Sequence, residues 1–350
     1  MERTAYRIVD ANFNRAREAI RVIEEYCRFG LDSAALSARA RRLRHELTIA
    51  IGRLDAGRLI CSRDTLGDVG VGRTVDKKLE RNELRDCFAA ACKRLTEALR
   101  ALAEVTRTGS LSVAEAIEAL RYDAYTLEKD IVVFGEPAQK FARVKLYVII
   151  TSNLPAEIIS LANKCSSADA DCIQLRAKDI KDDTFLAVAS EFVQICEAAG
   201  VLSIINDRVD VAAAAGADGV HLGQNDLPVE QARRLQLTPL IIGKSTHSLE
   251  QLRSACAERP TYVSLGPVFT TETKPGAAPV GLDYVTKAVE ELAHTGIGHV
   301  AIGGITPDNI NQVVKAGAKT IAVCSAVTGA RDPAAVCRAL GERIAALSKE

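Results

Sequence analysis

From Leu146 onward, the chain repeats one pattern eight times: a short apolar run followed by a segment with helical spacing. The runs are apolar along their whole length, which is typical of strands buried on both faces of a parallel sheet. Eight such units in the roughly 205 residues that remain predict an α/β fold, a (β/α)₈ TIM barrel. A doubly wound open sheet is the alternative, but its site would normally lie at one switch point. The runs read YVIIT, CIQLR, LSIIND, GVHLG, LIIGKS, YVSLGPVF, HVAIGGI and TIAVCSAV.

Seven polar clusters lie at the ends of these runs. Residues from the ends of several barrel strands meet at one face, so we expect the clusters to form one site. They contain acids suited to Mg²⁺, bases suited to phosphate, and Gly or hydroxyl turns suited to a second phosphate, which predicts diphosphate chemistry. The clusters are QLRAK (174–178), INDRVD (205–210), HLGQND (221–226), GKSTH (243–247), TTETK (270–274), IGGIT (302–306) and CSA (324–326).

Two of these clusters contain acids that are one βα unit apart, Asp207 and Asp226. Neighbouring strand ends would bring both carboxylates to the same rim. Mg²⁺ is commonly held by one or two carboxylates, with water and substrate phosphate oxygens completing its shell. The alternative is that each Asp caps the helix that follows it. The pairing favours the metal, so we predict Asp207 and Asp226 as the Mg²⁺ ligands.

Gln174, Arg176 and Lys178 alternate along one strand and its exit, so they share a face that points into the barrel or to its rim. A buried basic side chain needs an anion to balance its charge, and the guanidinium group of Arg can make two parallel hydrogen bonds to oxygen atoms. A structural ion pair with acids of the next strand is the alternative. Of the histidines, His221 falls in mid-strand, as a hydrogen-bonded core histidine would, and the role of His247 stays open.

A second phosphate site is predicted from the loops after the later strands. TTETKPGAAP (270–279) is a Gly/Pro-rich loop able to move over the site, in which Lys274 could add charge to a leaving diphosphate and Thr271 and Thr273 could donate hydroxyls. IGGIT is interpreted as a Gly turn into the seventh helix, whose backbone N–H groups would face an anion. Ser325, after the last strand, completes the set, and phosphate capture after strands 7 and 8 is common in barrels.

The chain before about Phe134 has a different periodicity, with apolar residues every three or four positions. We predict an all-α domain over residues 1–135 and the barrel over 136–350, joined by a linker at FGEPAQ (134–139), where Gly and Pro occur together. The link at 61–75 between the second and third helices is predicted to be irregular. The expected helices cover 11–29, 34–54, 79–107 and 112–132.

Composition excludes several classes of function. Lys+Arg and Asp+Glu both number 45, so no net charge recruits nucleic acid or an acidic membrane. No apolar stretch approaches the roughly 18–20 residues that span a bilayer, and the charged N-terminus has no signal-peptide core, which favours a cytoplasmic protein. The ten cysteines show no zinc-ligand spacing. We therefore expect small-molecule substrates, with no nucleic acid or membrane partner; whether identical chains assemble stays open.

The clusters QLRAK, NDR…ADGVHLGQNDLP, GPVFTTETK, IGGIT…N and AVCSAV together resemble the thiamine phosphate synthase family over roughly Leu146–Val327. The resemblance implies that the enzyme joins hydroxymethylpyrimidine diphosphate to hydroxyethylthiazole phosphate and releases pyrophosphate, with Mg²⁺ held by Asp207 and Asp226. It implies pyrimidine diphosphate contacts from Gln174, Leu175, Arg176, Ala177, Lys178, Asn206, Ser245 and Lys274. It implies thiazole phosphate contacts from Thr271, Glu272, Thr273, Gly304, Cys324 and Ser325.

The expected chemistry needs little acid–base catalysis, because the diphosphate leaves from a benzylic-type carbon on an electron-rich aminopyrimidine. We expect Mg²⁺, Arg176, Lys178 and Lys274 to stabilise the charge that develops on the leaving group. Two residues depart from the family pattern: Ala177 stands where Glu is expected and Cys324 where a small aliphatic residue is expected. Neither position supplies a required charge. The alternative is a regulatory or thiazole-processing relative that binds ligand without coupling.

The helical half resembles a domain fused ahead of this synthase in some bacteria, through DANFNRAREAIRVIEEYCRF and a later Arg63 with Asp68-Val69-Gly70. The resemblance implies hydroxymethylpyrimidine phosphate kinase activity, and with it ATP. The sequence itself contains no P-loop or kinase signature. Asn and Arg residues are predicted at a helix start, where they would suit an anion, with a helix cap or solvated face as the alternative; a scaffold or dimerisation module is the competing function. These residues are Asn12, Asn14, Arg15 and Arg21.

Overall fold

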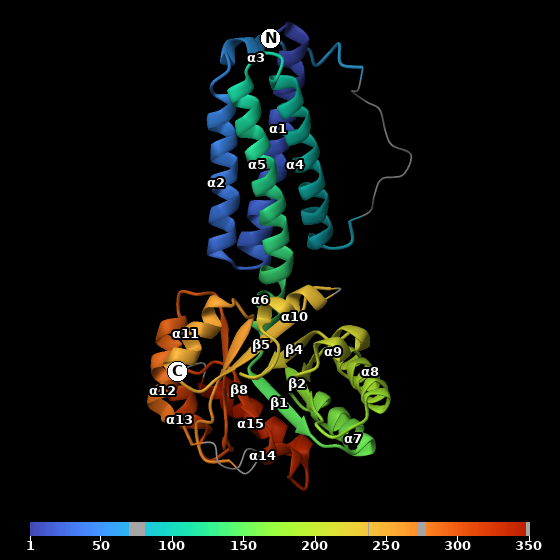
Figure 1. Ribbon diagram of the computed structural model, residues 1–350, viewed down its shortest axis with the longest axis vertical. Helices are drawn as coiled ribbons and strands as arrows, with labels where there is room; N and C mark the ends of the chain where they lie inside the picture. The colour runs from blue at the N-terminus through green and yellow to red at the C-terminus, as the bar shows by residue number, and fades with distance from the viewer. Residues whose placement is uncertain (70–80, 237, 272–277, 348–350) are drawn as a thin grey trace. The chain divides into compact units, whose positions relative to one another are not determined.

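The computed structural model describes residues 1–69, 81–236, 238–271 and 278–347. The chain divides into two compact units, Met1–Glu136 and Pro137–Glu350 (Figure 1). Each unit buries its own apolar core, so each is described by itself.

The first unit is a bundle in which α1 packs against α2 and α4, and α5 packs against the same two helices (Figure 1). Helix starts follow local capping: the Ser33 hydroxyl accepts from the backbone N–H of Leu36, and Glu83 and Asp86 form a reciprocal capping box. The elements are α1 (Arg3–Glu25), a π-helical turn η1 (Tyr26–Gly30), α2 (Ala34–Ile51), α3 (Ala56–Cys61), α4 (Leu84–Thr106), α5 (Leu111–Asp130) and a second π-helical turn η2 (Ile131–Gly135).

The four predicted helices are present, but their starts and links differ from prediction. Helix α1 begins at Arg3, because Tyr6 and Val9 extend its buried face toward the N-terminus. Asn12 and Asn14 therefore lie inside the helix, where their amides donate to carbonyls four residues back, and their predicted position at a helix start is wrong. The short α3 was not predicted, since six residues give too little periodicity. Residues 70–80 lie outside the described part of the chain. They include the rest of the predicted link, up to Val75, and the predicted start of the third helix at 79–80.

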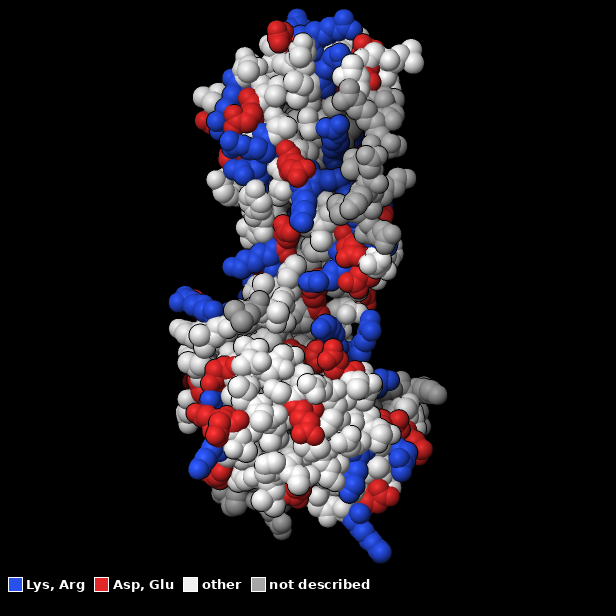
Figure 2. All heavy atoms as spheres, turned by 90° about the vertical axis from the view of Figure 1, so that its right-hand side faces the viewer, with Lys and Arg blue, Asp and Glu red and all other residues white. Residues whose placement is uncertain are grey.

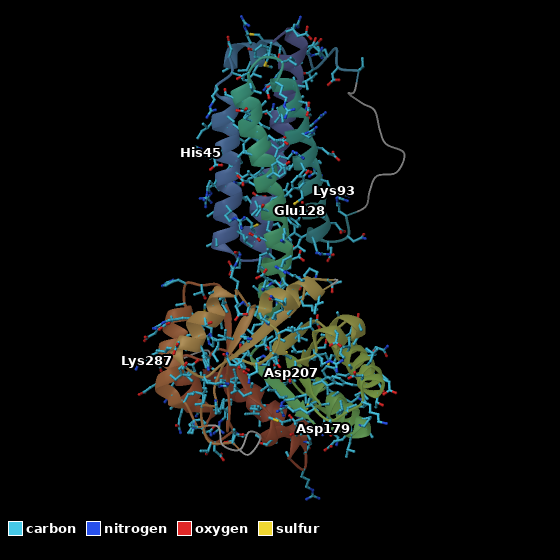
Figure 3. All side chains as sticks on the ribbon, viewed as in Figure 1. His45, Lys93, Glu128, Asp179, Asp207 and Lys287 are labelled. Atoms are coloured by element: carbon cyan, nitrogen blue, oxygen red, sulfur yellow. The ribbon has the colours of Figure 1, made fainter. Side chains whose placement is uncertain are left out.

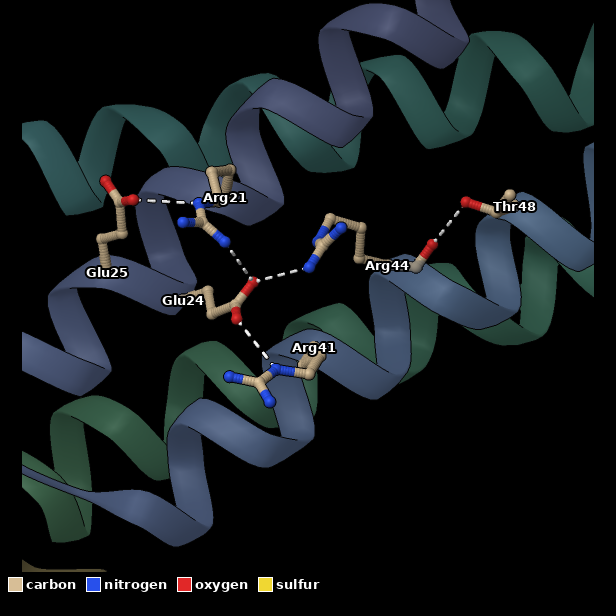
Figure 4. Close-up of polar contacts among 6 residues, drawn as sticks. All are labelled: Arg21, Glu24, Glu25, Arg41, Arg44 and Thr48. Atoms are coloured by element: carbon tan, nitrogen blue, oxygen red, sulfur yellow. Dashed lines mark hydrogen bonds and ion pairs between the residues drawn. The ribbon is translucent and has the colours of Figure 1, made fainter.

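Glu24 is the most buried charge of the bundle, 2 % exposed, and it draws the guanidinium groups of two helices together (Figure 4). Arg41 Nε and Arg44 Nη2 each donate to its carboxylate at 3.1 Å, and Arg21 Nη1 lies 3.6 Å away. Burial raises the pKa of Glu24, but the hydrogen bonds from Arg41 and Arg44 outweigh it and hold the pKa below its usual value. Arg21, which was predicted near an anion, therefore serves an ion pair within the fold, and it also contacts Glu25.

The second unit is a closed barrel of parallel strands in the order β1 to β8 within the described part of the chain, which confirms the predicted fold class. Each predicted apolar run contains one strand. The strands are β1 (Leu146–Thr151), β2 (Cys172–Arg176), β3 (Leu202–Asn206), β4 (Gly219–Leu222), β5 (Ile241–Thr246), β6 (Tyr262–Leu265), β7 (Gly298–Ile302) and β8 (Ile321–Val323). The helices are α6 (Glu136–Phe141), α7 (Pro155–Ser166), α8 (Asp182–Ala199), α9 (Val209–Ala215), α10 (Val229–Leu235), α11 (Leu249–Ala257), α12 (Gly281–Leu292), α13 (Ile310–Lys315), α14 (Ser325–Thr328) and α15 (Pro333–Leu347).

Alternation along the strands divides the barrel core into two parts. Residues such as Leu175 and Val263 pack outward against the surrounding helices, while Tyr147 and Tyr262 point into the barrel interior. Phe141 of α6 belongs to this interior core, where its ring stacks on Tyr262 at a centroid distance of 4.1 Å. The FGEPAQ segment (134–139), predicted as a linker, is instead helical: it spans the end of η2 and the start of α6, and α6 continues to Phe141 in the barrel core.

The surface carries both signs of charge. On the face drawn in Figure 2, basic and acidic side chains occur on each unit, in keeping with the equal totals of 45 and 45. Among the described residues, no helix combines the length and the apolar character required to cross a membrane.

Candidate active site

The carboxyl ends of the barrel strands surround a cavity of about 610 Å³, a size suited to a small-molecule ligand. Every strand supplies at least one residue to its wall. Most of the predicted site residues that the structure describes meet here, although they come from clusters far apart in the sequence. Those lining the cavity are Gln174, Arg176, Lys178, Asn206, Asp207, Asp226, Ser245, Thr271, Gly304, Cys324 and Ser325.

The basic row at the cavity rim begins on β2. Gln174 is 2 % exposed, while Arg176 and Lys178 lie progressively closer to solvent, as the period-two spacing predicts. The loop that carries Lys178 is tied to the preceding loop, because Asn153 Oδ1 accepts from the backbone N–H of Lys178 at 3.1 Å and its amide donates at 3.3 Å to Asp179, which is labelled in Figure 3. The backbone that carries the Lys178 side chain is therefore held in place.

Asp207 and Asp226 face one another from neighbouring βα loops. Asp207 follows β3 in a left-handed backbone conformation, with φ +64°, and its N–H donates to the carbonyl of His221 at 2.8 Å. Asp226 Oδ2 accepts from the backbone N–H of Gly223 at 2.6 Å. The buried Lys244 holds the same turn, since its Nζ donates to the Gly223 carbonyl at 3.0 Å. The Asp226 carboxylate is thus held by a backbone N–H, and the backbone of Asp207 is held by the His221 carbonyl.

The electrostatics of this pair suit a divalent cation. Burial, followed by the neighbouring Asp226, raises the pKa of Asp207 to about 6, although Lys178 and Arg176 act in the opposite direction. Two carboxylates that disfavour each other's charge are stabilised together by a metal. No group of three or more His, Cys, Asp or Glu side chains in the described ranges is arranged to hold a metal, so a cation here would need water or substrate oxygens as well. That requirement fits Mg²⁺.

The opposite wall of the site is built by the turn after β7 and by the end of β8. Gly304 has φ +63°, and a Cβ there would lie 2.4 Å from the carbonyl oxygen of Thr270, so only glycine fits without displacement. Asn309 Nδ2 donates to the Gly304 carbonyl at 2.8 Å, which closes this turn on itself. Helix α13 begins at Ile310, so the predicted Gly turn leads into the helix through a further turn that Asn309 holds.

Some predicted residues do not face the cavity. Leu175 is fully buried in the core between strands and helices, and Ala177 packs against the same core, because alternation turns both away from the barrel interior. Glu272, Thr273 and Lys274 lie outside the described residues, as does Gly70 of the N-terminal pattern.

Several residues were missed because they lie within strands that the sequence presents as apolar runs. Thr151 and Ser264 line the cavity from β1 and β6, and their positions in the period-two pattern could have identified them. His221 is buried, as predicted for a core histidine, yet it also lines the cavity. His247, whose role was left open, lines it too, and its Nδ1 contacts the Gly266 carbonyl.

Comparisons with known proteins cover both halves of the chain. Residues 146–327 match the family model described as thiamine monophosphate synthase, and residues 7–130 match that of the ThiD2 family. The thiamine-phosphate synthase of Thermosynechococcus vestitus is 40% identical over 343 residues, covering 97% of this chain and 94% of that protein. The chain belongs to the thiamine-phosphate synthase family.

Other members show the same extent of similarity. The thiamine-phosphate synthase of Nostoc punctiforme is 39% identical, again over 97% of this chain and 94% of that protein. A solved thiamine phosphate pyrophosphorylase from Pyrococcus furiosus matches with a TM-score of 0.54 and 35% identity, covering 58% of this chain and 96% of that one. The chain is therefore an enzyme, a transferase of thiamine biosynthesis, and the resemblance inferred from its sequence is confirmed.

Proposed function

We propose that the barrel condenses 4-amino-2-methyl-5-(diphosphooxymethyl)pyrimidine with hydroxyethylthiazole phosphate to give thiamine phosphate and pyrophosphate. The observation that carries the proposal is the convergence of two bases, Arg176 and Lys178, with the carboxylate pair Asp207 and Asp226 at one cavity rim. Bases next to paired acids suit a diphosphate whose charge is shared with a divalent cation. The family membership supports the same reaction.

In the proposed mechanism, Asp207 and Asp226 would hold Mg²⁺, which would supply positive charge to the leaving diphosphate. Arg176, Lys178 and Lys274 stabilise the same developing charge from the protein side. Gln174, Asn206 and Ser245 orient the pyrimidine ring. The Gly304 turn holds the thiazole phosphate, with Thr271, Glu272, Thr273, Cys324 and Ser325, so that the two reactants are aligned before the new C–N bond forms.

The metal assignment is tested by steady-state coupling assays on Asp207→Ala and Asp226→Ala. Each variant should lose on the order of 10²-fold in kcat, because the leaving-group charge is no longer offset. Asp210→Ala is the matched control: Asp210 lies three residues beyond Asp207, but its carboxylate is engaged by Arg208 at 2.7 Å and does not line the cavity. Turnover at the wild-type rate by both cavity variants in limiting Mg²⁺ would remove the metal assignment.

For the N-terminal unit, we propose an ATP-dependent kinase that phosphorylates hydroxymethylpyrimidine phosphate and so supplies the barrel's substrate. Support comes from the ThiD2 family match and from a contact that joins both motifs identified in the sequence. Arg63 donates to both oxygens of Asp10, at 2.6 and 2.8 Å, and Asp10 is 8 % exposed. This bidentate pair fixes the segment after α3 against α1.

The kinase proposal is tested by supplying the full chain with the monophosphate, ATP and thiazole phosphate. Arg63→Ala should abolish conversion of the monophosphate while leaving coupling intact when the diphosphate is supplied. Arg121→Ala, which breaks a comparable bidentate pair with Glu118 in α5, should retain both activities. If the wild-type chain shows no ATP-dependent conversion, the helical unit is a scaffold or dimerisation module.

A further inference from the structure

Five buried polar side chains form one continuous hydrogen-bonded chain inside the barrel, here called the lumenal chain. Gln174 Nε2 donates to the Tyr147 hydroxyl at 2.8 Å, and the hydroxyls of Tyr147 and Tyr262 are 2.9 Å apart. The Tyr262 hydroxyl is 3.0 Å from His221 Nδ1, and His221 Nε2 is 3.0 Å from Ser245 Oγ. The chain therefore joins five strands and places its two ends, Gln174 and Ser245, in the cavity wall.

The middle of the lumenal chain is held by close packing. Both tyrosines are 1 % exposed and lie one layer deeper in the barrel than the cavity-lining residues of their strands. A Cβ at Gly243 would lie 2.4 Å from the Tyr262 hydroxyl oxygen and 2.6 Å from His221 Nδ1. The contact between Tyr262 and His221 therefore requires glycine at position 243. On the other side, Phe141 stacks on the Tyr262 ring with an interplanar angle of 4°. The Tyr262 hydroxyl consequently has little freedom to turn away.

One assignment of the hydrogens gives the lumenal chain a single direction, from Gln174 to Ser245. The 2.9 Å contact between the two tyrosines fits either donor; in this assignment, the Gln174 amide donates to Tyr147 and Tyr147 donates its hydroxyl hydrogen to Tyr262. Tyr262 then donates to His221 Nδ1, which puts the imidazole hydrogen on Nε2, where it is donated to Ser245 Oγ. Ser245 is left to donate its own hydrogen into the cavity. At the other end, the carbonyl oxygen of Gln174 remains an acceptor.

We propose that the lumenal chain sets ring specificity in the pyrimidine subsite, selecting a 4-aminopyrimidine over the 4-oxo ring of the same shape. An aminopyrimidine offers a ring nitrogen that accepts from Ser245 and an amino group that donates to the Gln174 carbonyl. The 4-oxo ring presents a carbonyl in place of the amino group and carries a hydrogen on a ring nitrogen, so donors and acceptors are exchanged. This inference rests on the proposed function, which places Gln174 and Ser245 against the pyrimidine.

Tyr147, Tyr262 and His221 act in this account as positioning residues, because they work through the groups at the two ends. A site with fixed donors and acceptors rejects a mismatched analogue strongly, since its own buried polar groups are left unpaired. A site whose hydroxyl and amide can reorient discriminates poorly. Loss of the Tyr262 hydroxyl frees the His221 tautomer, and with it the direction of the Ser245 hydroxyl.

The test is Tyr262→Phe in the full chain, which removes the hydroxyl and keeps the ring on Phe141. The measured quantity is kcat/KM for the amino and the 4-oxo pyrimidine diphosphates at fixed thiazole phosphate; an oxo compound that is not turned over is measured as a competitive inhibitor. We expect kcat/KM for the amino substrate to fall roughly 10- to 100-fold, mostly through KM, and the amino/oxo ratio to fall at least about 10-fold. Tyr147→Phe should act in the same direction and serves as the second variant should the first not fold.

Tyr284→Phe is the matched control. Tyr284 lies on α12 and also has a buried hydroxyl, bonded to Thr246 Oγ1 at 2.7 Å, but it does not line the cavity. This control should keep the wild-type amino/oxo ratio. If Tyr262→Phe and Tyr147→Phe lower both activities equally and leave the ratio unchanged, the tyrosines are merely structural and the inference is overturned while the proposed function stands. If the wild-type chain does not couple the amino substrate at all, the proposed function fails, and the inference fails with it.

Discussion

Replacing Asp226 by Asn should stabilise the metal-free protein, an outcome that few buried polar substitutions produce. Burial and then Asp226 raise the pKa of Asp207 to about 6 from an ordinary value of 3.8. Each unit corresponds to about 1.4 kcal/mol, and since water reaches this rim and Asp226 is only the second cause, we assign about 1 kcal/mol to the repulsion. The pKa of Asp207 is higher in the folded protein than in the unfolded chain, so ionisation of Asp207 lowers the free energy of unfolding. This destabilisation is absent below about pH 4, grows between about pH 4 and 6, and is complete at about pH 7.5.

The assay is thermal unfolding of the full chain at pH 7.5, with EDTA or with saturating Mg²⁺. Without metal, Asp226→Asn should raise the midpoint of the barrel transition by about 2–4 °C, because the carboxamide oxygen can still accept from Gly223 while the repulsion is gone. With Mg²⁺, the wild type should gain stability and Asp226→Asn should not. Asp210→Asn, outside the cavity, should keep the wild-type metal response. An Asp226→Asn protein that is destabilised in EDTA and still stabilised by Mg²⁺ would refute the reasoning.

Three further predictions concern other parts of the barrel. Phe141→Ala should destabilise the protein by about 3–5 kcal/mol in urea unfolding, because a ring that is 2 % exposed leaves a cavity against Tyr262; an effect below 1 kcal/mol would show that α6 does not close the barrel interior. Burial lowers the pKa of His299 to about 4, below its unfolded value near 6.5. As the pH falls from about 6.5 to about 4, the free energy of unfolding of the wild type should therefore decrease by up to about 3 kcal/mol more than that of His299→Gln. Equal decreases in both proteins would contradict this prediction. Gly304→Ala should raise the KM of the thiazole phosphate selectively, whereas Arg176→Ala should raise that of the pyrimidine diphosphate and lower kcat; the reverse pattern would exchange the two subsites.

The barrel could be predicted from the sequence because its strands are buried on both faces and are therefore apolar along their length. The same geometry explains why Gln174, Arg176 and Lys178 were recognised as one row: alternate residues of a strand share a face. Asp207 and Asp226 could be paired because consecutive strands of a barrel are neighbours. These inferences need only local spacing and the order of the elements along the chain.

What the sequence did not reveal depends on contacts between distant residues. Tyr147 and Tyr262 look like ordinary members of apolar runs, and their hydroxyl contact joins residues 115 positions apart. The start of α1 was misplaced because Asn12 looks like a helix cap, while the buried positions that extend the helix to Arg3 are set by packing in the bundle. The Gly and Pro of FGEPAQ are typical of a loop, yet Pro137 lies in the first turn of α6, and Phe141 at the end of that helix packs in the barrel core. Tertiary packing overrides the local preference in each case.

The central claim is that this chain's barrel joins a pyrimidine diphosphate to a thiazole phosphate with the help of Mg²⁺. It is tested most directly by measuring pyrophosphate release and thiamine phosphate formation by the purified full chain while one component at a time is left out. We predict equal amounts of both products when the diphosphate, the thiazole phosphate and Mg²⁺ are all present, and none when the diphosphate or the thiazole phosphate is omitted or when EDTA replaces Mg²⁺. Undiminished formation of both products in EDTA, or no thiamine phosphate in the complete mixture, would contradict the account.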